Sequence, residues 1–518
     1  MSHPPRTRAK WSHVARSSLL IAVFFTLDKG LGLVRQVIIG RQFGVSPELD
    51  AFNAANNLPD LLFAIISGGA LAIAFIPVLS ATLEKEGRQA AWDLFSRVAN
   101  WAFLITGALA LLLALFADRL VRAELGVAPG FTPELQRLVA QLMRLNLLAT
   151  LLFSLSGLVI AGLQANQHFL LPAMAPVLYD LGQIFGALVL APENGYALGP
   201  LRLPAIGLGV HGLVYGVILG AALHLGVQIP GLLRYGFRWQ PRLGTHHPGL
   251  QRVARMMAPR ILTIGAFQTV FVVQDNLASR LELGSVTALA YGWLIMQVPE
   301  TIFGTALGTA LLPTLSEQHA RADKRAFAAS VHRAVAVLIA LCLPAAAIIG
   351  LTARPLVQFA FRFDPAGTDL VVAAARAYLL GLLGHSLLEV AARGFYARQN
   401  ATTPLMAAGV GAVTFVIAGL ALFKPLGAAG IGLSNSLAFS LEALLLLVLL
   451  SRSHPGILRH GRTLLRAALG SGLALAAGAA LMALFPQGGL LSGLVPLMAG
   501  SALAVPFIWP ELKLLRRL

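Results

Sequence analysis

Three ionisable residues lie inside a long apolar segment near the start of the chain, at 17–43. Asp28, Gly32 and Arg35 follow a spacing of i, i+4 and i+7, which places them on one face of a helix, and Lys29 adjoins Asp28. Because a charge facing hydrocarbon is costly, this face must line a polar cavity or meet a polar partner. We expect a cavity lining; a closed salt bridge inside a helix bundle is the alternative.

Other apolar segments also carry ionisable residues. Asp275 can serve a cation or proton site, or it can be a hydrogen-bonded packing residue, and the sequence does not choose between them. Glu389 stands four residues from His385 and four from Arg393, a spacing that predicts a network within one helix. Two single acids are expected to be hydrogen-bonded in the bundle: Asp180 and Glu442.

Catalytic and cofactor-binding motifs are absent from the sequence. There is no GxxxxGK[ST] phosphate loop, no HExxH and no GxSxG. His246 and His247 lack a third ligand at helical spacing, and the single cysteine, Cys342, can form no disulfide within the chain. We therefore predict no enzyme, no metal and no cofactor. If the chain is a transporter, no nucleotide site within it would drive transport, which would then run downhill, on an ion gradient or on the membrane potential.

Composition indicates the elements that carry these residues. Of 518 residues, 57% are hydrophobic and 12% are charged, about half the charged share of a soluble domain, and the mean hydropathy is +0.76. These values exclude a soluble enzyme, a disordered protein and a disulfide scaffold. The apolar runs are long and lack the alternation of barrel strands, so the predicted fold is an all-α polytopic membrane protein.

Fourteen candidate spans follow one another with short connections, which leaves no room for a sizeable soluble domain. The first is expected to be a retained helix, because no small-residue cleavage site follows it. The spans are expected at about 17–43, 56–82, 92–116, 135–163, 172–191, 204–230, 256–281, 286–315, 330–352, 371–395, 404–423, 428–451, 464–485 and 491–510.

Basic residues set the expected orientation. Lys and Arg number 39 against 22 Asp and Glu, a net charge of +17. Most of those outside the spans fall in the tails and in the alternate loops that include 232–255. By the positive-inside rule, both termini should be cytoplasmic. This surplus suits anionic membrane lipids as partners, and no nucleic acid is expected as a partner.

An internal repeat divides the chain. Gly162 to Ala175 shares six identities with Gly394 to Ala407, and Ile76-Pro77 echoes Leu312-Pro313 at a nearly equal offset. Related six-helix lobes of one orientation predict a substrate site between them. The expected parts are a basic cytoplasmic tail (1–16), an N-terminal lobe (17–231), a basic cytoplasmic linker (232–255), a C-terminal lobe (256–451), and two extra helices with a basic cytoplasmic tail (452–518).

Several motifs resemble the MurJ (MviN) lipid II flippases of the multidrug/oligosaccharidyl-lipid/polysaccharide exporter superfamily. They lie across nearly the whole chain: Gly32-Leu-Val-Arg35, Phe43-Gly44, Asp50-Ala-Phe52, Asn57-Leu-Pro59, Ala74-Phe-Ile-Pro77, Phe303 to Pro313, Ala392-Arg-Gly-Phe-Tyr-Ala397 and Thr403-Pro404. The resemblance implies that a peptidoglycan precursor, lipid II, is flipped across the cytoplasmic membrane by alternating access. Its diphosphate would enter a cationic cavity, and its tail would follow a groove made with the last two spans.

The resemblance also implies site residues. Arg35 and Asp50 fall on cavity positions of the family, Lys29 replaces a usual arginine, and Asp28 is on the same face. Two further cavity arginines of the family are replaced here, one at Phe63 or its neighbour Ala64 and the other at Trp293.

Asp275 matches an acidic position of the family, but the span at 405–423 supplies no Asn or Asp to complete a sodium site. Two alternatives to lipid II transport therefore stay open. One is export of another lipid-linked glycan or an amphipathic compound, and the other is a non-transporting membrane scaffold.

Overall fold

The computed structural model describes residues 13–66, 70–198, 201–484 and 489–517. Residues 1–12 of the expected basic tail (1–16) therefore lie outside the described residues. The described chain is almost entirely helical, which confirms the predicted all-α class. Two-residue strands β1 (Ala197–Leu198) and β2 (Leu201–Arg202) form a small antiparallel pair.

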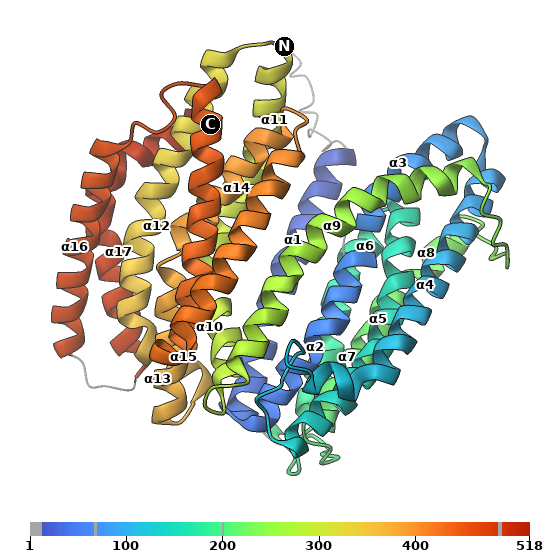
Figure 1. Cartoon of the computed structure of the whole chain (residues 1–518), viewed down its shortest axis with the longest axis horizontal. Helices are drawn as coiled ribbons and strands as arrows, with labels where there is room; N and C mark the ends of the chain where they lie inside the picture. Colours follow the sequence, from blue (N-terminus) through green and yellow to red (C-terminus); the bar gives the residue numbers. More distant parts are fainter. Residues whose placement is uncertain (1–12, 67–69, 199–200, 485–488, 518) are drawn as a thin grey trace, which may run out of the picture. The chain divides into compact units, whose positions relative to one another are not determined.

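The helices follow the order of the apolar segments (Figure 1). They are α1 (His13–Phe43), α2 (Pro47–Ile66), α3 (Ala70–Lys85), α4 (Arg88–Arg122), α5 (Pro133–Ala165), α6 (Leu170–Phe185), η1 (Gly186–Leu190), α7 (Val210–Gly226), α8 (Ile229–Arg234), α9 (Pro248–Ala278), α10 (Ser285–Glu300), η2 (Thr301–Thr305), α11 (Ala306–Ala320), α12 (Lys324–Phe361), α13 (Pro365–Leu379), α14 (Leu382–Tyr396), α15 (Thr402–Ser453), α16 (Gly461–Leu484), α17 (Leu490–Leu512) and η3 (Lys513–Arg517).

Eight helices in the described part of the chain are long and apolar enough to cross a membrane, or nine if the bent pair α13–α14 is one span. Some expected spans are interrupted in the structure, since the segment 286–315 is divided among α10, η2 and α11. Conversely, α15 contains two expected spans joined end to end across Gly427, whose φ of 59° and ψ of −142° are not helical. The chain is therefore a membrane protein with many apolar helices. The predicted count of fourteen spans is consistent with these helices.

The described contacts divide the chain into two units. Unit 1 comprises Met1–Gln42, Leu58–Ala117 and Ala140–Ile264, and unit 2 comprises Phe43–Asn57, Asp118–Val139 and Gly265–Leu518. The expected boundaries of the two lobes and of the linker stay predictions. Each unit is described by itself below.

Glycines bring α6 and α7 of unit 1 together. A Cβ added to Gly182 would overlap the backbone of Gly220, and one added to Gly216 would lie 2.8 Å from the Cα of Gly186. In a membrane there is no hydrophobic driving force between helices, so their association depends on close packing. Small residues spaced four apart let two helices approach closely. The glycines of these apolar segments therefore set the separation of the two helices.

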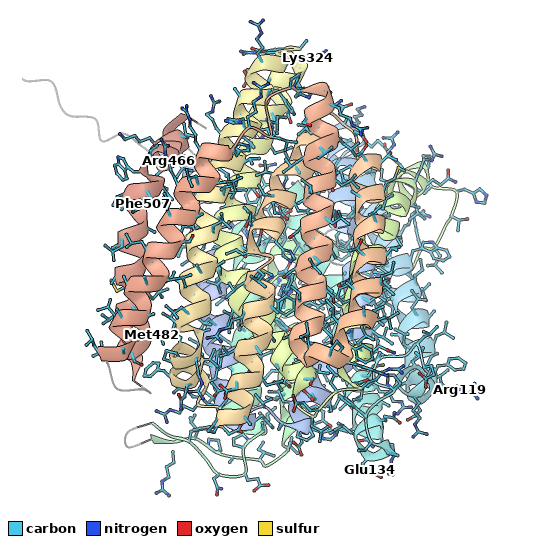
Figure 2. All side chains as sticks on the ribbon, turned by 60° about the vertical axis from the view of Figure 1, so that its left-hand side comes forward. Arg119, Glu134, Lys324, Arg466, Met482 and Phe507 are labelled. Carbon is cyan, nitrogen blue, oxygen red and sulfur yellow. The ribbon has the colours of Figure 1, made fainter. Side chains whose placement is uncertain are left out.

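In unit 2, α16 and α17 pack against each other and against α12. Arg466 of α16 pairs with the buried Glu511 of α17, with 3.3 Å between Nη1 and Oε1. Figure 2 shows Lys324 at the upper end of α12, Arg466 towards the upper end of α16 and Met482 towards the lower end of α16. Phe507 of α17 lies on the flank between the levels of Arg466 and Met482. Basic residues thus lie at one end of these helices, and apolar residues lie along their flank.

Candidate functional site

The polar face of α1 meets an acid on α6. Nη1 of Arg35 donates to Oδ1 of Asp180 at 2.6 Å, and Gly32, one turn away, lies beside the same carboxylate. The side chain of Asp180 is 5% exposed and that of Arg35 is 19% exposed. The shared face of Gly32 and Arg35 is thus confirmed. Arg35 forms a closed salt bridge, the stated alternative to a cavity lining, with a partner that the sequence did not identify.

Lys29 and Asp28 lie at the more open end of this face. Their charged atoms are 3.3 Å apart, and the lysine side chain is 62% exposed against 21% for the aspartate. Lys29 also lies over the ring of Phe25, with Nζ 5.2 Å from the centroid. Within unit 1, Lys29 therefore presents an accessible cation. The cargo-binding roles of Asp28, Lys29 and Arg35 stay predictions.

Asp50 is fully buried in unit 2, where it caps a helix. Its carboxylate accepts hydrogen bonds from the backbone N–H of Gly284 at 2.6 Å and of Thr287 at 2.7 Å. These N–H groups belong to the first turn of α10, where helices have unpaired donors. The geometry gives Asp50 a structural role in holding α2 to α10, and its expected contact with cargo stays a prediction.

Asp275 lies on α9 with a neutral partner. Its Oδ2 accepts a hydrogen bond from Nδ2 of Asn57 at 2.8 Å, and the same amide donates to the carbonyl of Phe271 at 3.0 Å. Next to it in sequence, Gln274 accepts from the hydroxyl of Tyr378 at 2.7 Å. Among the described residues no three His, Cys, Asp or Glu side chains are grouped to hold a metal ion. Asp275 thus has the hydrogen bond of a packing residue, and its expected role in ion coupling stays a prediction.

Aromatic rings surround the two positions where the resemblance places missing arginines. Phe63 lies edge-on to Phe153, with ring centroids 5.1 Å apart. In unit 2, Trp293 packs against three rings at 5.3 to 5.6 Å: Phe271, Tyr378 and His385. At both positions the side chain is part of an aromatic cluster within its own unit.

The predicted network within α14 forms only in part. Glu389 and Arg393 are ion-paired as expected. His385 instead bonds Asn435 of α15 at 3.0 Å and stacks on Phe439, with centroids 4.1 Å apart. The neighbouring helix offers the imidazole a better-placed partner than its own helix does, so the i, i+4 contact with Glu389 is not made.

Comparisons with known proteins identify the family. A family model described as lipid II flippase MurJ matches residues 39–495. The chain is also 32% identical over 472 residues to a lipid II flippase MurJ of Burkholderia cenocepacia, covering 88% of each chain. The chain belongs to the MurJ family.

Further relatives and solved structures agree with the MurJ assignment. A probable lipid II flippase MurJ of Vibrio cholerae is 26% identical over 443 residues, covering 83% of this chain and 82% of that relative. The solved structure of a lipid II flippase MurJ in an inward closed conformation matches with a TM-score of 0.77 at 21% identity, covering 94% of this chain and 98% of the other. A multidrug resistance MATE transporter matches with a TM-score of 0.68 at 14% identity, covering 84% and 96%. These two structures establish the fold.

Proposed function

We propose that this chain moves lipid II across the cytoplasmic membrane by alternating access. Membership of the MurJ family over nearly the whole chain carries this proposal. Lipid II and its diphosphate are then the cargo, and no nucleotide or other cofactor takes part. The multi-pass fold of apolar helices suits this role, and both termini are proposed to be cytoplasmic.

The cationic face of α1 is the proposed diphosphate site. Lys29 is accessible, and Arg35 has several guanidinium N–H groups beyond the one that bonds Asp180. Arginine binds phosphate oxygens through paired, charge-assisted hydrogen bonds. We propose that Asp180 holds Arg35 in place while cargo is absent and that the diphosphate takes over part of this pairing.

Asp28 is proposed to orient Lys29 through their 3.3 Å contact. Asp50 is proposed to act on cargo indirectly, by fixing α10 through the Gly284 and Thr287 amides. Asp275 is the proposed ion-coupling residue. Because no three His, Cys, Asp or Glu side chains are grouped around a metal position in the described part of the chain, a proton is a better candidate than sodium, which normally needs several oxygen ligands.

Rescue of cells depleted of their own lipid II flippase tests the proposal. The wild-type chain should restore growth and normal cell shape. If an abundant, membrane-inserted chain fails to rescue, the cargo is another lipid-linked compound or the protein is a scaffold, and the proposal is wrong.

A further inference from the structure

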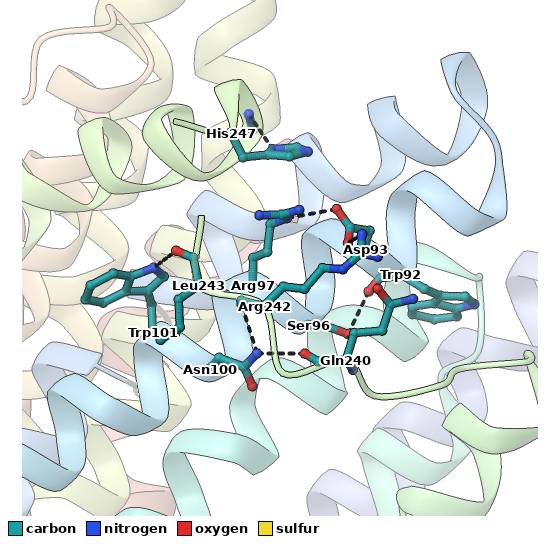
Figure 3. A network of polar contacts seen from close by, with 11 residues as sticks. Trp92, Asp93, Ser96, Arg97, Asn100, Trp101, Gln240, Arg242, Leu243 and His247 are labelled. Atoms are coloured by element: carbon teal, nitrogen blue, oxygen red, sulfur yellow. Dashed lines mark hydrogen bonds and ion pairs between the residues drawn. The ribbon is translucent and has the colours of Figure 1, made fainter. Parts of the chain in front are cut away.

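A non-helical segment of unit 1, residues 235–247, is bound along α4 by side chains of that helix. We call this segment the strap. Asn100 donates to the carbonyls of Gln240 at 2.8 Å and Arg242 at 3.0 Å, and the indole of Trp101 donates to that of Leu243 at 2.6 Å (Figure 3). Asp93 pairs with Arg97 at 2.8 Å and with Arg242 at 3.0 Å. The strap is therefore a fixed part of unit 1.

The strap helps to enclose an apolar cavity of about 370 Å³. This volume lies within the usual range of ligand pockets. Its walls come from α4, α5, α7, α8 and the strap: Phe95, Ala99, Asn100, Phe103, Leu155, Leu158, Val159, Leu225, Ile229, Leu232, Leu233, Phe237 and Trp239.

Water is a poor occupant of this cavity. Asn100 is the one polar residue among the lining residues that the structure describes, and its amide is already engaged: Nδ2 bonds the strap carbonyls and Oδ1 accepts from the indole of Trp239 at 2.8 Å. A buried water needs two to four polar partners, whereas apolar cavities bind apolar groups. The chemistry of the walls therefore favours a hydrocarbon chain.

Large apolar side chains of the lining are partly open to the surroundings. Phe103 is 45% exposed, Leu233 is 58% exposed and Trp239 is 63% exposed. In a membrane protein such groups contact lipid, and tryptophan concentrates at the level of the headgroups. We therefore expect the opening to lie where the acyl region of a membrane meets its headgroup region.

Basic residues adjoin, in sequence, the lining residues of α8 and the strap. Arg234 and Arg238 are exposed and lie within five residues of Trp239, and Arg242 is 59% exposed in its pair with Asp93. We propose that the cavity binds one acyl chain of an anionic membrane phospholipid, whose phosphate contacts Arg234 and Arg238. This lipid is a bound structural partner and is distinct from the cargo.

Native mass spectrometry of the purified full chain tests the site, with phosphatidylglycerol and phosphatidylcholine as probes. An arginine near the membrane surface strengthens attraction to anionic lipid by about fivefold. Wild type should therefore prefer phosphatidylglycerol by more than about tenfold. Ala99→Trp fills the cavity and should lose this lipid, whereas Leu115→Trp, on the exposed face of the same helix, should retain it.

The charge contribution is tested separately. The double variant Arg234→Gln with Arg238→Gln should lose the anionic preference, while Arg459→Gln with Arg462→Gln, which removes two exposed arginines of unit 2, should keep it. Leu233→Glu, at an exposed wall position, should repel the anionic lipid even if Ala99→Trp does not fold.

Three results would overturn the proposal. They are equal binding of both phospholipids by wild type, unchanged binding by folded Ala99→Trp or Leu233→Glu, and displacement of the phospholipid by lipid II at equal concentration. The last result would assign the cavity to the cargo tail. Failure to rescue flippase-depleted cells would leave phospholipid binding unaffected, so the two proposals fail separately.

Discussion

At the scale of single residues, Arg35 combines a structural and a proposed functional role. Its contact with Asp180 joins two helices of unit 1 through a charge pair that is mostly shielded from solvent. Removing one member of such a pair leaves an uncompensated buried charge, which commonly costs about 3–5 kcal/mol. Loss of transport in a single Arg35 variant would therefore have two explanations, and the pair must be neutralised as a whole.

Neutralising the Arg35–Asp180 pair should separate its effect on stability from its effect on transport. Arg35→Gln and Asp180→Asn alone should each lower the melting temperature, because each leaves one charge unpaired. The double variant should recover most of that stability, since two amides can hydrogen-bond, but it should still fail to rescue flippase-depleted cells because the cation is gone. Thermal unfolding and rescue are measured on all three variants. Full rescue by the double variant would show that Arg35 does not bind the diphosphate.

The environment of His460 predicts that the folded protein becomes less stable in acid. It lies between α15 and α16, stacks on His332 with ring centroids 4.3 Å apart, and donates from Nε2 to the carbonyl of Ile457 at 2.6 Å. Burial, followed by the charge of His332, lowers the pKa of His460 from 6.5 to about 4. The unfolded chain therefore binds the proton first, and stability should fall as the pH drops from about 6.5 to 4.

His460→Phe keeps the ring and removes this titration. Its melting temperature should fall less than that of wild type between pH 6.5 and pH 4, whereas His246→Phe, at an exposed position, should behave as wild type does. Equal slopes for wild type and His460→Phe would contradict the assignment.

At the scale of elements, the contact between α6 and α7 depends on the absence of side chains. Gly216→Ala should lower the melting temperature of the purified protein, because the new Cβ meets the backbone of Gly186. Gly226→Ala, at the end of the same helix and with open space around its Cα, is the matched control and should be neutral or slightly stabilising. A tolerated Gly216→Ala would mean that the helices can separate without loss.

The sequence predicted the helices better than it predicted which side chains meet between them. Apolar length located the helices, and the spacing of Gly32 and Arg35 located the polar face of α1. The acid that meets Arg35 stands 145 positions along the chain, and the amide that meets Asp275 is 218 positions away. Such pairings depend on which helices pack together, which helical periodicity does not encode. One sequence signal for the Arg35–Asp180 pair was available: two apolar segments of one expected lobe carry opposite charges.

Other local features could not be predicted because they are properties of packing. His385 had an acid at helical spacing but bonds Asn435 on the adjacent helix. Trp293 occupies a position where the resemblance suggests a cation, and only the surrounding rings of Phe271 and Tyr378 show what replaces it.

At the scale of the whole molecule, the proposed orientation in the membrane rests on the distribution of basic residues. We expect residues 232–255 in the cytoplasm together with both termini. In a Cys342→Ser background, Thr245→Cys should be unreactive towards an impermeant thiol reagent in intact cells and reactive in inverted membrane vesicles. Thr245 is exposed, so burial would not explain protection. Labelling in intact cells would reverse the proposed topology.

Lipid II translocation by the purified chain in proteoliposomes is the most direct test of the proposed flippase activity. An impermeant enzyme added outside should modify lipid II from both leaflets when wild-type protein is present, and only about half of it in protein-free vesicles. Vesicles that hold the folded Arg35→Gln, Asp180→Asn double variant should resemble the protein-free ones. If wild-type vesicles also expose only the outer half, the chain does not flip lipid II and the proposed function is wrong.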